Sequence, residues 1–186
     1  YKNKEQSLII YSSTTLLLFY PINLFLNLEL DILYKILFTL VILYFVFLTI
    51  QKLRNRKRKL KDMTVYFYIS SMIFLAIGSI YWLAMSIFTL PENLLGIILG
   101  LGFMVSLMNG MLYKIIPFLT WFHLNAKGLF DIPSMREMIP MKNMQTQFYL
   151  HLFSMIGFIL GFGFSITIII KLAIFLFIVS NILLFI

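Results

Sequence analysis

Cysteine is missing from this sequence of 186 residues, and charged side chains make up only 12% of it. The first absence excludes disulfides, thiolate metal sites, iron–sulfur clusters and cysteine nucleophiles. The second leaves about half of the charged fraction of an ordinary soluble domain. Hydrophobic residues make up 61% of the chain, which is more apolar surface than a soluble fold of this length can bury. The composition therefore predicts an integral membrane protein that contacts the lipid bilayer.

The hydrophobic residues fall into six segments separated by short polar interruptions. All but the last reach the roughly 20 residues that a membrane-crossing helix needs, and none alternates in polarity as lipid-exposed β-strands do. We predict an all-α fold, a polytopic transmembrane helix bundle of about six spans that forms one domain over 1–186. Because the sequence begins at Tyr1 and stops inside an apolar run, it is expected to be part of a longer chain. The expected spans are 7–28, 32–50, 63–90, 94–124, 148–170 and 172–186.

Positive charge is concentrated on one side of the expected spans. Seven of the 15 Lys and Arg residues lie in the polar run 51–62, and five more lie at the N-terminus and in or beside the loop 125–147. Short loops rich in Lys and Arg remain in the cytoplasm during membrane insertion. The N-terminus and both loops are therefore predicted to be cytoplasmic. The membrane itself is expected to be a bacterial inner membrane.

The basic run 51–62 has two interpretations. It acts as a topology signal alone, or it also binds anionic lipid head groups, which clustered Lys and Arg attract. Nucleic acid is not expected as a partner, because the run is short and lacks the interleaved aromatic residues of such sites. The candidate head-group ligands are Arg54, Arg56, Lys57, Arg58 and Lys59.

Two of the expected spans repeat the pattern Gly-x-x-x-Gly-x-Gly. Glycines four residues apart share a helix face, and the missing side chains let two helix backbones approach closely. We therefore expect both faces to pack against other helices, although a thin wall beside a passage or a cofactor is an alternative. The glycines are Gly96, Gly100 and Gly102 in the fourth span, and Gly157, Gly161 and Gly163 in the fifth.

The fourth span, 94–124, is longer than a bilayer requires. Its 31 residues make about 46 Å of straight helix, against a hydrocarbon core of about 30 Å. Pro117 lacks a backbone donor and clashes with the preceding turn, so a kink or break is expected there. Lys114 lies one turn earlier, and two interpretations remain open for it: snorkelling to the interface, or a fixed cation that binds an anionic substrate together with Tyr113 and Asn109.

His123 and His151 are the only histidines in the sequence. One closes the fourth span and the other opens the fifth, so both are expected near the cytoplasmic face. Two neutral imidazoles on facing helices can bind a haem iron or share a metal, but an unliganded histidine is also stable at the interface. No carboxylate pair, Ser/His/Asp set or phosphate-binding glycine loop accompanies them.

The stretch GMLYKIIPFLTWFHL, followed by IPSMREMIP, is similar to a stretch of divergent bacterial membrane proteins related to the haem–copper oxidase subunit I superfamily. The similarity covers 109–140, less than a fifth of the chain. It implies a larger set of bundled helices that enclose haem within the membrane. The histidines that ligate haem and copper in that family have no counterparts here, so no catalytic residues are carried over.

Three functions remain open on the sequence. The resemblance and the two histidines favour a haem-associated membrane protein of respiratory type. The glycine motifs, Pro117 and Lys114 favour a transporter or permease, since a discontinuous helix beside a charge commonly marks a substrate site. A structural or assembly subunit that associates with other membrane subunits is the third.

Overall fold

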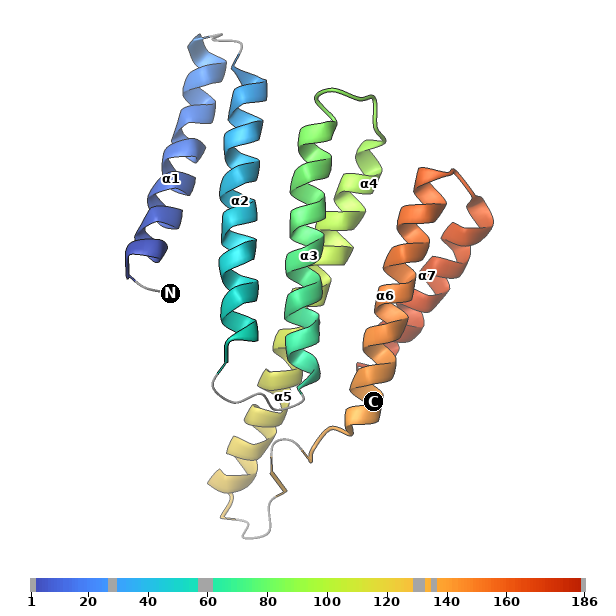
Figure 1. The fold of residues 1–186 in the computed structure, drawn as a ribbon. Helices are drawn as coiled ribbons and strands as arrows, with labels where there is room; N and C mark the ends of the chain where they lie inside the picture. Colours follow the sequence, from blue (N-terminus) through green and yellow to red (C-terminus); the bar gives the residue numbers. More distant parts are fainter. Residues whose placement is uncertain (1–2, 27–29, 57–61, 129–132, 135–136, 185–186) are drawn as a thin grey trace.

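The computed structural model describes residues 3–26, 30–56, 62–128, 133–134 and 137–184. Within these ranges all regular structure is helical, and six helices follow one another along the chain (Figure 1). The predicted all-α fold is confirmed. The helices are α1 Asn3–Leu26, α2 Asp31–Arg54, α3 Met63–Ala84, a continuous helix made of α4 Glu92–Gly96, the π-helix η1 Ile97–Val105 and α5 Ser106–Ala126, and then α6 Met141–Gly163 and α7 Thr167–Ile182.

Four of the described helices are long and apolar enough to cross a membrane, rather than the six that we expected. They are Asp31–Arg54, Met63–Ala84, Glu92–Ala126 and Met141–Gly163. The helix α7 is apolar but has only 16 residues, about 24 Å against a hydrocarbon core of about 30 Å. The helix α1 has 24 residues but is not among these four candidate spans.

Local capping moves several helix ends away from the limits of the apolar segments. The third helix ends at Ala84 rather than at residue 90. The helix α6 begins at Met141, seven residues before the expected span, because Pro140 provides an extended residue at its N-terminus. A tight turn in which Ser165 has a φ of 57° separates α6 from α7. At the start of α3, the Asp62 side chain accepts a hydrogen bond from the Thr64 backbone N–H at 3.0 Å.

The helices pack side by side in chain order, with α3 between α2 and the helix α4–η1–α5 and with α6 paired to α7 (Figure 1). Polar contacts join the first three helices. The Asn23 amide donates to Asp31 at 2.8 Å across the α1–α2 turn, and the Lys35 ammonium donates to the Ser86 hydroxyl at 2.7 Å beyond the end of α3. The last turns of α5 extend beyond the ends of α3 and α6 (Figure 1).

The outside of the described chain is more apolar than the surface of a soluble protein. Large apolar residues cover much of it, among them Phe25 at 87% exposure and Ile168 at 79%. The interior contains apolar side chains such as Phe67 and also small polar ones such as Ser71 and Ser154. No Asp, Glu, Lys or Arg is buried in the part of the chain that the structure describes. Such a surface is stable when the surroundings are apolar, and it would aggregate in water.

Only part of the two glycine motifs lies against other helices. A Cβ built on Gly157 would lie 2.9 Å from the Ala173 Cβ, and one on Gly161 would lie 2.6 Å from the Ile170 Cγ1, so both glycines let α7 approach α6 closely. Gly102 makes the same kind of contact with Phe74 of α3. By contrast, Gly96, Gly100 and Gly163 have no neighbouring atom within 4 Å of that position, and they do not pack as we expected.

The expected break at Pro117 is not present. The helix α5 runs without interruption from Ser106 to Ala126, with Pro117 buried inside it. The irregularity lies upstream, in the nine-residue π-helix η1. A π-helix is rare and often marks a functional site. The excess length of this helix is accommodated by the projecting end of α5 rather than by a break.

Candidate functional site

A set of buried polar side chains lies on α5 and α6, which are joined by a hydrogen bond at Ser106 and His151. On α5, Ser106, Asn109 and Tyr113 are spaced by three and four residues, and on α6, Gln147 and His151 are four residues apart. Both spacings put side chains on one face of a helix. All five residues are buried, and Ser106, Gln147 and His151 have no exposed surface. We call these five residues the polar cluster.

A hydrogen bond between the two helices sets their relative register. The Ser106 Oγ lies 2.7 Å from the His151 Nε2. Because α5 and α6 run in opposite directions (Figure 1), moving forward from Ser106 corresponds to moving backward from His151. Asn109 therefore lies at the level of Gln147, and Tyr113 lies at the level of Met144. This register agrees with the packing of Met144 against the buried Tyr113 and Phe148.

Most of the hydrogen-bonding capacity of the polar cluster is unused. Among the described residues, five buried side-chain atoms have no hydrogen-bond partner: Asn109 Nδ2, Tyr113 Oη, Gln147 Nε2, Gln147 Oε1 and His151 Nδ1. All five belong to the polar cluster. An unsatisfied buried polar group costs about 1–3 kcal/mol, and native proteins keep few of them. Their concentration in four residues of the polar cluster makes the cluster the candidate binding site.

Aromatic rings enclose one side of the polar cluster. Phe67 of α3 is completely buried, and its ring centroid lies 5.8 Å from that of Tyr113 and 6.4 Å from that of His151. Phe177 of α7 lies 6.0 Å from the His151 ring. These rings separate the polar atoms from the apolar exterior and lower the local dielectric, so that hydrogen bonds formed in the cluster are strengthened.

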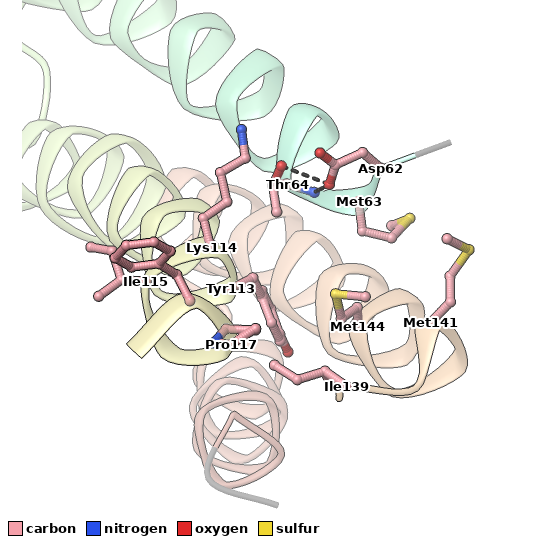
Figure 2. Close-up of a pocket in the computed structure, with 11 residues that line it drawn as sticks. Asp62, Met63, Thr64, Tyr113, Lys114, Ile115, Pro117, Ile139, Met141 and Met144 are labelled. Atoms are coloured by element: carbon pink, nitrogen blue, oxygen red, sulfur yellow. Dashed lines mark hydrogen bonds between the residues drawn. The ribbon is translucent and has the colours of Figure 1, made fainter. Parts of the chain in front are cut away.

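A pocket of about 500 Å³ lies next to the polar cluster, and Tyr113 belongs to both. Its walls come from the N-terminus of α3, from the segment of α5 around Pro117 and from the first turn of α6. Figure 2 shows Tyr113 reaching into this space, on the side where Ile139 and Met144 lie. Tyr113 is thus the member of the polar cluster that lines this pocket, at the end of the bundle where α3 and α6 begin.

The structure separates Lys114 from the other two residues of the expected anion site. Asn109 and Tyr113 are buried, whereas Lys114 is exposed. The Lys114 ammonium lies 5.2 Å from the centre of the Tyr68 ring, and the side chain extends toward α3, away from Tyr113 (Figure 2). Successive residues of an α-helix point in different directions, so Lys114 faces the rim of the pocket while Tyr113 faces its interior.

The two histidines do not share a site. His123 is exposed near the end of α5, and its Nδ1 lies 2.8 Å from the Leu119 carbonyl oxygen of the same helix. It follows Ser106 by 17 residues, which is about 25 Å along a helix, whereas His151 contacts Ser106 directly. Haem held between these residues does not fit the structure. Among the described residues, there is also no group of three or more His, Asp or Glu side chains that could hold a metal.

The basic run 51–62 is described only in part, since residues 57–61 lie outside the described residues. Arg54 ends α2, and the Arg56 Nε donates to the Leu53 carbonyl oxygen at 3.0 Å. Lys57, Arg58 and Lys59 fall in the part whose structure is not described. Binding of anionic lipid head groups by this run therefore stays a prediction.

Asn109, Tyr113 and His151 were predicted as site residues from the sequence, whereas Ser106 and Gln147 were not. A signal for Ser106 was present, since it lies three residues before Asn109 inside the expected span 94–124. Polar residues in such segments usually face the interior of the bundle. Gln147 had no such signal, because it falls at the end of the expected loop 125–147.

Comparisons of the chain with protein-family models, with curated proteins and with solved structures find no match.

Proposed function

We propose that this chain is a multi-pass membrane protein that binds a small uncharged polar solute at the polar cluster and carries it across the bilayer. Four candidate spans and an apolar exterior support the membrane setting. The observation that carries the proposal is the group of five buried polar atoms without hydrogen-bond partners.

The chemistry of these atoms indicates what kind of solute is bound. The Asn109 and Gln147 amide nitrogens are donors, the Gln147 Oε1 is an acceptor, and the Tyr113 hydroxyl can act as either. No Asp, Glu, Lys or Arg is among the buried residues of the described chain, so a charged solute would lack a counter-ion in a medium of low dielectric. An uncharged molecule with both donors and acceptors fits this arrangement best.

A structural or assembly role explains the polar cluster less well. Polar residues that hold membrane helices together do so by bonding to one another across the interface. Here the Ser106–His151 contact does this, but the polar atoms of Asn109, Tyr113 and Gln147 that have no partner do not. The π-helix η1 ends at the residue before Ser106, and irregular helices beside a buried site are common in transporters.

Permeation of urea and glycerol through reconstituted vesicles tests the transport function. We expect vesicles that contain the full chain to equilibrate with one of these solutes faster than protein-free vesicles, as measured by stopped-flow light scattering. Asn109→Leu removes a donor of the polar cluster at nearly constant volume. It should lower the protein-dependent permeation rate about tenfold or more, because the loss of one hydrogen bond to the solute costs about 1.4 kcal/mol.

The neighbouring exposed residue Met108 provides the control for this experiment. Met108→Leu lies on the same helix but points away from the polar cluster, so its permeation rate should equal that of the wild type. Equal rates in protein-containing and protein-free vesicles, for both solutes, would contradict the proposal.

The asymmetry of Lys and Arg predicts that the end of α2 lies on the cytoplasmic side and that the start of α4 lies outside. Asn55 and Asn93 mark these two ends, and both are exposed. Because the chain has no cysteine, Asn55→Cys and Asn93→Cys each introduce a single thiol. In intact cells, a membrane-impermeant maleimide should label Asn93→Cys and leave Asn55→Cys unlabelled until the cells are opened. The opposite pattern would reverse the proposed orientation.

A further inference from the structure

Three methionines line the pocket beside Tyr113, and neither the polar cluster nor the proposed transport function uses them. They are Met63 at the start of α3 and Met141 and Met144 in the first turn of α6. Figure 2 shows the side chains of Met63 and Met141 on the same side of the pocket, with Met144 between Tyr113 and Met141. Two helices that are distant in the sequence thus contribute three methionines to the lining of one pocket.

The methionines of α6 belong to a regular series along the chain. Met135, Met138, Met141 and Met144 recur at every third residue. Residues three apart lie on one face of a helix, so Met141 and Met144 both face the pocket once α6 begins after Pro140. A purely apolar wall would need no particular residue type at this spacing, and Leu or Ile would serve equally well.

Thioether sulfur is a soft ligand that selects soft metal ions such as Cu(I) over hard ions such as Mg²⁺ or Ca²⁺. The remaining polar groups of the pocket do not compete for the metal. Asp62 accepts hydrogen bonds from the Thr64 backbone N–H and hydroxyl, at 3.0 and 2.7 Å. The Lys114 ammonium extends over Tyr68, away from the methionines (Figure 2). The chain also has no cysteine whose thiolate would bind the ion more tightly.

We propose that Met63, Met141 and Met144 form a binding site for a soft monovalent cation of the Cu(I) type. The site is separate from the solute site at the polar cluster, and it stands whether or not urea or glycerol permeates. Binding involves no redox step, because the ion enters and leaves in the same oxidation state. Ag(I), which has the same softness and charge and is stable in air, is the appropriate probe.

Titration of the purified full chain with silver nitrate in detergent tests this proposal. We expect isothermal titration calorimetry to detect one Ag(I) site in the wild type. The triple variant Met63→Leu, Met141→Leu, Met144→Leu keeps the apolar volume of the pocket but removes all three sulfurs, so its affinity should be lower by about tenfold or more. A ligand held only by apolar contact would bind both proteins equally.

A second triple variant, Met104→Leu, Met108→Leu, Met111→Leu, is the matched control. These three methionines are exposed on η1 and α5 and do not line the pocket, so this variant should bind Ag(I) like the wild type. Equal affinity of the wild type and the pocket variant would overturn the proposal, as would the absence of Ag(I) binding to the wild type.

Ag(I) binding can also be measured on the wild-type protein, which covers the case in which the triple pocket variant does not fold. In a sample labelled with ¹³C at the methionine methyl groups, Ag(I) should shift the NMR signals of Met63, Met141 and Met144 and leave that of Met108 unchanged. Single Met→Leu variants assign these signals. Equal shifts at exposed and pocket methionines would indicate non-specific binding and would overturn the site.

Discussion

Replacing Gln147 by methionine is expected to stabilise the protein and to abolish the proposed solute permeation. The Gln147 side chain is completely buried, and both of its polar atoms lack hydrogen-bond partners. Methionine has a similar shape and no polar group to desolvate, so Gln147→Met should raise the free energy of unfolding by about 1–3 kcal/mol. For a chain of this length, this corresponds to a rise in Tm of about 2–4 °C per kcal/mol, measured by thermal denaturation in detergent.

The same helix offers a matched control at Gln145. This residue is exposed, so Gln145→Met should change the free energy of unfolding by less than about 0.5 kcal/mol and leave permeation of urea and glycerol intact. A large loss of stability in Gln147→Met would show that its amide is bonded within the native core. Gln147 would then be a structural residue, and the proposed solute site would lose its central member.

Replacing Gly161 by leucine is expected to cause the largest loss of stability of any substitution in the glycine motifs. A Cβ at this position would lie 2.6 Å from the Ile170 Cγ1 and 3.1 Å from the Ile170 backbone nitrogen. The side chain of Ile170 can move, but its backbone cannot move without separating α7 from α6. Overpacking of this kind costs about 1–3 kcal/mol and occasionally more, so the Tm of Gly161→Leu in detergent should fall by several degrees.

Gly100→Leu is the control, because it occupies the equivalent place in the other motif. No atom lies within 4 Å of a Cβ built there, so the leucine side chain would extend into open space. We expect its Tm to remain within about 2 °C of the wild type, the range of a surface substitution. If Gly100→Leu destabilised the protein as much as Gly161→Leu, the packing of α6 against α7 would not explain the effect.

The helical architecture could be predicted largely from composition. A long apolar run in lipid can satisfy its backbone only as a helix, so six apolar segments yield six helices whatever their tertiary contacts. The ends of these helices could not be predicted in the same way. The start of α6 at Met141 and the turn at Ser165 depend on local backbone conformation, which hydropathy does not report. Mean hydropathy also did not distinguish the four candidate spans from the shorter α7.

The glycine motifs show why a pattern alone does not determine packing. Both have the same spacing, yet Gly157 and Gly161 contact α7 while Gly96 and Gly100 contact nothing. A motif makes close approach possible, but the presence of a neighbouring helix on that face decides whether it occurs. In α6 the short turn to α7 provides the neighbour. At Gly96 in α4 and Gly100 in η1, no described helix lies close enough to provide one.

The sequence by itself determined that polar residues such as Asn109, Tyr113 and His151 lie inside apolar segments, where they must be enclosed or bonded. Only the tertiary structure decided which of them meet. Ser106 pairs with His151, whereas His123 lies about 25 Å along α5 and Lys114 turns to the rim. The physical reason is that a helix fixes the direction and the rise of its residues relative to one another. The sequence does not fix which side of α5 lies against the other helices, because that depends on how the helices pack.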